Sequence, residues 1–137
     1  MCKAAGIGTA IETSLIIYDE EVFKNLDVVM ADLKIWDSAL HKKYTGVPNE
    51  GIKEHFKKLN TIGVPIIART PVILEINQEL DKISGFLKGL ENVRQYELLP
   101  YHPLGVSKQK ALGKEEVLFT IPSKEQMKEM SKYAYIR

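Results

Sequence analysis

Charged and polar side chains stand at the ends of several short apolar stretches, where they could bind a small molecule. Asp32 and Lys34 are two residues apart, so on a β-strand both side chains point to the same face. A carboxylate and an ammonium group removed from water need a partner, which is either each other or a ligand. The pair indicates a site for a cation or a zwitterionic small molecule, or else a self-satisfied salt bridge, and spacing alone does not choose. The other stretches end in Glu12 and Thr13, in Arg69, and in Glu97 followed by His102.

The apolar stretches predict four β-strands, at residues 7–13, 28–34, 64–69 and 93–99. Amphipathic stretches separate them, which is typical of βα units and a parallel sheet. We therefore expect an α/β fold: a partial (β/α) TIM-type barrel of four parallel strands with crossover helices, forming an open arc. A closed eight-stranded barrel takes about 250 residues, so 137 residues suit roughly half of one. The two exposed sheet edges indicate possible self-association.

Apolar residues at helical spacing predict the helices. One is expected over residues 52–62, with Asn49 as its N-cap and Gly63 as its stop, and a second over residues 80–90 behind Asn77. Acidic residues 19–21 suit the start of a further helix. No linker or repeat interrupts the chain, so we expect residues 1–137 to form a single domain. A capping box predicts a last helix, with Ser123 and Gln126 at its start and Met127, Met130 and Ala134 along it.

Composition excludes several classes of function. The net charge of +1 offers no broad electrostatic footprint for nucleic acid, and no apolar run is long enough to span a bilayer. The single cysteine, Cys2, cannot form an internal disulfide or alone hold zinc or an iron–sulfur cluster, so we expect a cytoplasmic protein. His41 and His55 are interpreted as packing or surface residues. His102, in a loop, could act as a base, a hydrogen-bond partner or a stacking surface.

An ordered series of short motifs runs through nearly the whole chain. The motifs are Thr9-Ala10-Ile11-Glu12-Thr13-Ser14, Asp32-Leu33-Lys34, His41 with Thr45-Gly46 and Asn49, Arg69-x-Pro71, Glu97-Leu98-Leu99-Pro100-Tyr101-His102, Leu104-Gly105, and residues 108–113. Each alone is weakly specific. In this order and spacing the series resembles the C-terminal half of the glycyl-radical-enzyme activases, the radical S-adenosylmethionine (SAM) family that includes pyruvate formate-lyase activating enzyme.

The resemblance implies a partial (β/α)6 barrel in which these four strands are the last four. It also implies an oxidoreductase of anaerobic metabolism in which a [4Fe–4S] cluster on a CxxxCxxC loop binds SAM and reductively cleaves it. The resulting 5′-deoxyadenosyl radical would take a hydrogen from a glycine of the partner, a glycyl radical enzyme. A flavodoxin or ferredoxin-type protein would supply the electron.

The resemblance also implies site residues. Lys34 would contact the methionyl carboxylate of SAM, His102 its nucleoside, and Arg69 would line the cavity near SAM and the substrate loop. Asp32 would face the same ligand. A monovalent-cation site beside the carboxylate would be formed by Glu12, Thr13, Asp32 and the backbone near Met30.

The chain departs from the family pattern in two places. It has no CxxxCxxC and no Gly-Gly-Glu stretch, so by itself it should lack the cluster and be inactive, and Cys2 is assigned no ligand role. The turn at residues 71–78 lacks the usual Pro-Gly. Two alternatives stay open: a non-catalytic truncated barrel module that binds a partner, and a barrel enzyme using Asp32, Lys34 and His102 in acid–base chemistry.

Overall fold

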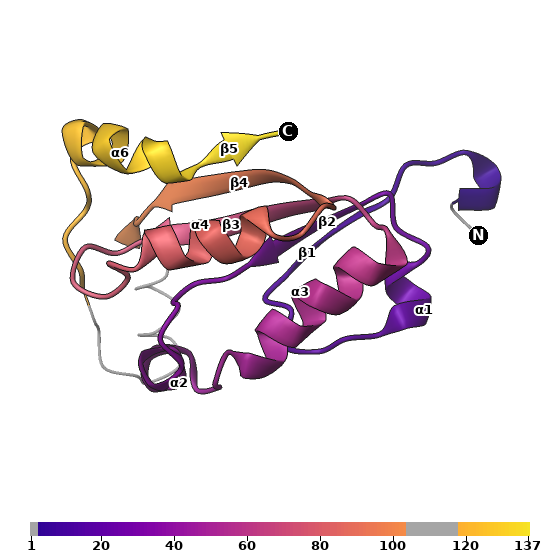
Figure 1. The fold of residues 1–137 in the computed structure, drawn as a ribbon, viewed down its shortest axis with the longest axis horizontal. Coiled ribbons are helices and arrows are strands. Elements are labelled where there is room, and N and C mark those ends of the chain that lie inside the picture. The colour runs from indigo at the N-terminus through magenta and orange to yellow at the C-terminus, as the bar shows by residue number, and fades with distance from the viewer. Residues whose placement is uncertain (1–2, 104–117) are drawn as a thin grey trace.

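The computed structural model describes residues 3–103 and 118–137, and its centre is one β-sheet. The sheet has five strands in the order β1-β2-β3-β4-β5 (Figure 1). The first four strands pair in parallel, as predicted, and the fifth is antiparallel. The bounds are β1 Ala10–Thr13, β2 Val28–Asp32, β3 Ile66–Val72, β4 Val93–Pro100 and β5 Tyr135–Ile136.

Helices connect the strands, and α3 and α4 lie on the same side of the sheet in Figure 1. The predicted helix with Gly63 as its stop is confirmed, because Gly63 ends α3 in the left-handed conformation, with φ of 82°. Within the described ranges, no helix has the length and apolarity needed to cross a bilayer. The helical bounds are η1 Lys3–Ala5, α1 Glu20–Phe23, α2 Ser38–Thr45, α3 Glu50–Ile62, α4 Leu80–Lys88, α6 Lys124–Met130 and η3 Ser131–Tyr133.

The predicted N-cap positions of α3 and α6 are both confirmed, but only at α6 does the side chain form the cap hydrogen bond. Ser123 and Gln126 form the reciprocal capping box at the start of α6. Asn49 precedes α3 but makes no side-chain cap hydrogen bond, and Glu79 rather than Asn77 is the residue that precedes α4. Both asparagine side chains bind backbone groups elsewhere, because an amide can satisfy a buried carbonyl as well as a helix end.

The hydrophobic core lies between the sheet and helices α3 and α4. Burial alternates along β3, so every second side chain from Ile66 to Val72 is buried and the others are half-buried. The buried side chains meet Phe56 and Leu59 of α3 and Ile83 of α4. The sheet therefore has one face covered by helices and a second face that is less buried.

The fifth strand corrects the predicted strand count of four. Tyr135 and Ile136 pair antiparallel with β4, and Arg137 binds the backbone carbonyls of Leu90 and Lys88 beyond the strand. The last helix consequently ends earlier than predicted, with Ala134 already extended. A strand of only two residues carries too little alternation to be recognised in a sequence. One edge of the predicted open arc, that of β4, is therefore covered.

Tyr96 is the largest fully buried side chain, and its burial makes stability sensitive to alkali. Its hydroxyl donates to Thr70 Oγ1 at 3.0 Å, and burial raises its pKa from 10.0 to about 12. Between these values the unfolded chain has released the proton and the folded chain has not. Folding stability is therefore full below pH 10 and falls as the pH rises towards 12.

We expect the Tyr96→Phe variant to lack this alkaline loss. Near neutral pH the variant should be less stable by about 1 kcal/mol, because the hydroxyl bond to Thr70 is gone. Between pH 10 and 11.5 the unmodified protein should lose about 1–2 kcal/mol of stability relative to the variant, so its advantage disappears or reverses. Urea unfolding at several pH values would measure this change. Parallel pH curves for the two proteins would show that Tyr96 does not titrate in this way.

Candidate functional site

Four charged side chains meet at the carboxyl end of the sheet, three from strands β1, β2 and β3 and one from just beyond β2. We call Glu12, Asp32, Lys34 and Arg69 the strand-end cluster. Arg69 lies at its centre: Nη2 is 2.6 Å from Glu12 Oε1 and 3.1 Å from Asp32 Oδ1, and Nε donates to the same Asp32 oxygen at 3.2 Å. Lys34 Nζ donates to the other oxygen, Asp32 Oδ2, at 2.9 Å. Each carboxylate is thus paired with at least one cation.

Strand register explains why these residues meet. Asp32 of β2 lies opposite Arg69 of β3, and Glu12 of β1 lies opposite Met30 of β2, two residues before Asp32. Side chains in register on parallel strands share a face, so all of them project from the less buried face of the sheet. Glu97 of β4 continues the row opposite Arg69 and accepts a hydrogen bond from Gln95.

Burial divides the cluster into a fixed part and an accessible part. The side chains of Arg69 and Asp32 are 12% and 19% exposed, whereas those of Lys34 and Glu12 are 35% and 64% exposed. The hydrogen bond from Arg69 lowers the pKa of Glu12, and the bond to Glu12 raises the pKa of Arg69. Glu12 and Arg69 are therefore both charged at neutral pH, and Lys34 is the more accessible cation of the cluster.

A cavity of about 370 Å³ adjoins Lys34. Its walls are largely apolar, so it suits a ligand with an apolar or aromatic body. Lys34 can use one N–H for Asp32 and offer its others to an anionic group of such a ligand. The cavity is lined by Lys34, Ile35, Lys43, Tyr44, Thr45, Pro71, Ile73, Ile76 and Phe119. The sequence reading missed its aromatic wall, Tyr44 and Phe119, because they come from segments with no shared pattern.

Two further predicted residues, Thr13 and Met30, lie next to the cluster. The Thr13 hydroxyl accepts from the backbone N–H of Leu15 at 2.9 Å and supports a turn in which Leu15 has a positive φ of 57°. Met30 is half-buried beside Glu12. The two carboxylates predicted to hold a monovalent cation share the guanidinium of Arg69 here. Among the described residues, no three His, Cys, Asp or Glu side chains form a metal-binding group.

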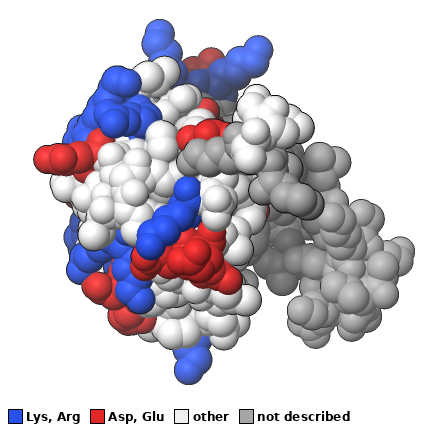
Figure 2. Space-filling model, turned by 90° about the vertical axis from the view of Figure 1, so that its right-hand side faces the viewer, with Lys and Arg blue, Asp and Glu red and all other residues white. Residues whose placement is uncertain are grey.

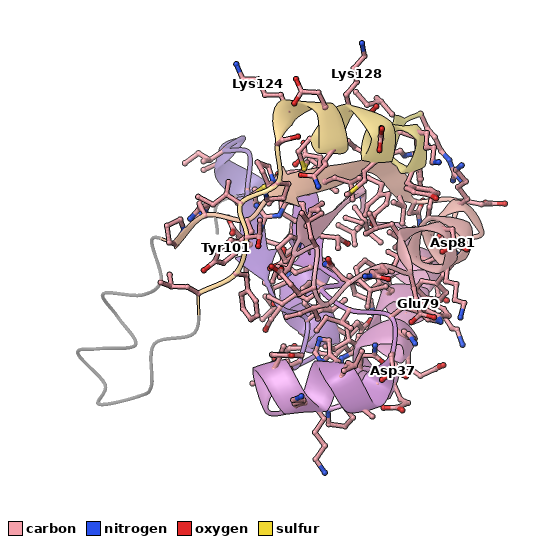
Figure 3. The ribbon with its side chains drawn as sticks, turned by 90° about the vertical axis from the view of Figure 1, so that its left-hand side faces the viewer. Asp37, Glu79, Asp81, Tyr101, Lys124 and Lys128 are labelled. Carbon is pink, nitrogen blue, oxygen red and sulfur yellow. The ribbon has the colours of Figure 1, made fainter. Side chains whose placement is uncertain are left out.

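His102 lies at the same edge of the sheet but outside the cluster. Tyr101 donates its backbone N–H to Val72 at the end of β3, so the next residue stands just beyond the strand ends. Figure 3 looks onto this edge, with Tyr101 where β4 ends. His102 is exposed. Contact between His102 and a ligand stays a prediction. Outside the described residues lie Cys2, Leu104-Gly105 and residues 108–113.

The turn after β3 forms without the Pro-Gly of the family pattern. Ile73 O accepts from the backbone N–H groups of Ile76 and Asn77, and Asn77 Oδ1 accepts from Ile73 N at 2.8 Å.

Charges on the opposite side of the molecule are mixed: Figure 2 shows Lys and Arg interspersed with Asp and Glu. The strand-end cluster and its adjoining cavity lie at the other end of the molecule, where the parallel strands end.

Comparison with known proteins gives sequence relatives although no protein-family model matches the chain. The pyruvate formate-lyase-activating enzyme of Clostridium pasteurianum is 34% identical over 140 residues, covering 97% of this chain and 59% of the relative. The enzyme of that name from Staphylococcus epidermidis is 34% identical over 145 residues, covering 96% of this chain and 58% of the relative. The chain therefore spans little more than half the length of these curated relatives.

Solved structures agree in fold. A domain of pyruvate-formate lyase-activating enzyme from Bacteroides vulgatus superposes with a TM-score of 0.75 at 24% identity, over 96% of this chain and 78% of that one. Coproporphyrinogen III oxidase from Escherichia coli, a radical SAM enzyme, superposes with a TM-score of 0.64 at 12% identity, over 94% of this chain and 32% of that one. The fold is thus an α/β fold similar to that of radical SAM enzymes. By sequence, the chain is similar to pyruvate formate-lyase-activating enzymes over nearly its whole length.

Proposed function

We propose that this chain is the C-terminal segment of a glycyl-radical-enzyme activating enzyme and supplies part of its SAM site. The observation that carries the proposal is Lys34, which is tied to Asp32 at 2.9 Å and also lines an apolar cavity. SAM has an anionic carboxylate on one end and an aromatic nucleoside on the other. An ammonium group beside an apolar cavity is complementary to such a molecule.

Three residues of the strand-end cluster then have separate roles. Lys34 binds the methionyl carboxylate of SAM, and Asp32 orients Lys34 from the less exposed side. Arg69 holds the Asp32 carboxylate through two N–H donors. In this proposal the four parallel strands are part of a barrel, with the ligand on their less buried face. His102, just beyond β4, contributes to the nucleoside end.

The [4Fe–4S] cluster of such an enzyme does not fit this segment by itself. A cluster needs several thiolates, and the chain has one cysteine. In the complete enzyme the cluster would supply the electron that cleaves SAM. In our proposal its ligands belong to another segment, and the chain alone is inactive.

The partner we propose is a glycyl radical enzyme of the pyruvate formate-lyase kind. The support is the name of the relatives, which states that they activate pyruvate formate-lyase. The hydrogen would come from a glycine of that partner, with a flavodoxin or ferredoxin-type protein as reductant, in the cytoplasm. Reading the codons before Met1 tests this origin: an in-frame CxxxCxxC supports the activating enzyme, and its absence favours a partner-binding module without catalysis.

The isolated chain is expected to bind SAM weakly, with a dissociation constant above the micromolar range. The strand-end cluster supplies contacts to one end of SAM, but the chelating contact with iron is missing. Calorimetric titration of SAM into the 137-residue chain measures this. Micromolar or tighter binding without iron would contradict the proposed division of the site between two segments.

A further inference from the structure

The segment that carries Lys34 is held by side chains rather than by regular secondary structure. β2 ends at Asp32, and the next four residues, 33–36, belong to no helix or strand. Nevertheless, each of their four carbonyl groups accepts a hydrogen bond from a side chain elsewhere in the chain. The donors are Thr70 Oγ1 to residue 33, Asn77 Nδ2 to residue 34, and Asn49 Nδ2 to residues 35 and 36, the last of which also accepts from Lys53 Nζ.

Asn77 is oriented unambiguously by its partners. Its Nδ2 donates to Lys34 O at 3.0 Å and to Pro71 O, and its Oδ1 accepts from Ile73 N at 2.8 Å. Rotating the amide by 180° would place its oxygen against two carbonyl oxygens, so only one orientation is possible. Asn77 is 5% exposed. It therefore fixes the backbone of Lys34 relative to the turn after β3.

Asn49 and Thr70 hold the two flanks of Lys34. Both are fully buried, and Asn49 Nδ2 lies 2.6 Å from Ile35 O and 2.9 Å from Trp36 O. Within the described residues, Asn49 Oδ1 is buried without a hydrogen-bond partner. An unsatisfied buried acceptor is costly, which indicates that the side chain is kept for its two donors. Thr70 Oγ1 donates to Leu33 O at 2.6 Å.

We propose that Asn77, Asn49 and Thr70 are positioning residues for Lys34: they fix the backbone on either side of it so that its ammonium group is presented to the ligand. A binding residue on an unanchored loop loses affinity through the cost of ordering it, and this arrangement removes that cost in advance. The inference rests on the proposed SAM-binding role of Lys34 and extends that role to residues whose side chains bind the backbone around it.

The test compares Asn77→Ala with Asn60→Ala. Asn60 of α3 is a matched control because its side chain also binds backbone: Oδ1 accepts from the N–H of Asn92 at 2.9 Å. Asn92 stands just before β4 begins, so this contact lies at the amino end of that strand, away from Lys34. The first measurement is amide hydrogen exchange of residues 33–37 in the chain. We expect exchange at least about tenfold faster in Asn77→Ala and unchanged in Asn60→Ala.

The second measurement is the SAM dissociation constant of the full-length protein that carries this chain. Asn77→Ala should weaken binding by about three- to tenfold, whereas Asn60→Ala should not. If Lys34→Ala weakens binding but Asn77→Ala matches Asn60→Ala, positioning is disproved and the proposed function stands. If Lys34→Ala has no effect, the proposed function fails, and this inference fails with it. Should Asn77→Ala not fold, Thr70→Val replaces it in both measurements, with the same expected results. Its control is Tyr96→Phe, which also loses the Tyr96–Thr70 hydrogen bond but keeps the bond from Thr70 to Leu33 O.

Discussion

Replacing Lys34 by alanine in the full-length protein is expected to weaken SAM binding by about 10- to 100-fold, the loss of one charge-assisted hydrogen bond of about 1.5–3 kcal/mol. The fold should be retained, because the Lys34 side chain is 35% exposed and the Asp32 carboxylate keeps its bonds to Arg69. Calorimetry or equilibrium dialysis with SAM measures the loss, and circular dichroism verifies the fold.

The control for this experiment is Lys57→Ala, which removes the same charge elsewhere. Lys57 lies on α3, its side chain is 54% exposed, and it pairs with Glu54 rather than with the strand-end cluster. A general electrostatic effect on an anionic ligand would appear in both variants, whereas direct contact affects Lys34→Ala alone. An unchanged dissociation constant in Lys34→Ala would disprove the proposed ligand role.

The sequence predicted the four parallel strands because short apolar stretches with β-branched residues are local signals. It also predicted that Asp32 and Lys34 meet, from their spacing of two on a strand to residue 34; β2 in fact ends at Asp32, so Lys34 lies just beyond the strand although the two side chains do pair. The salt bridge left open at that point does form, at 2.9 Å. Its formation does not exclude a ligand, because Lys34 also lines the adjoining cavity.

The pairing of Arg69 with Glu12 and Asp32 could not be predicted in this way. It depends on the register between β1, β2 and β3, which connecting segments of different length and shape determine. The side-chain partners of Asn49 and Asn77 could not be predicted for a related reason. Asn49 occupies the N-cap position of α3, as predicted, but its side chain binds carbonyls 13 and 14 residues away, and the Asn77 side chain binds a carbonyl 43 residues away. Long-range partners leave no local pattern.

Asp32→Ala should have the largest effect on the stability of the ligand-free chain. The Asp32 carboxylate accepts from Arg69 Nε and Nη2 through one oxygen and from Lys34 through the other. Without it, Arg69, whose side chain is only 12% exposed, keeps the Glu12 carboxylate alone, and Lys34 loses its partner. We expect the free energy of unfolding to fall by about 2–3 kcal/mol, which urea denaturation at pH 7 would measure.

Glu12→Gln provides the comparison that assigns this loss to a shielded ion pair. Glu12 contacts the same guanidinium at 2.6 Å, but its side chain is 64% exposed. Water already weakens the attraction between the two charges there, so removing the Glu12 charge should change the free energy of unfolding little. Distance alone would rank the two carboxylates in the opposite order, because the Arg69 contact to Glu12 is shorter than the one to Asp32, at 3.1 Å. A greater loss in Glu12→Gln than in Asp32→Ala would mean that contact distance, rather than exclusion of water, governs the strength of the cluster.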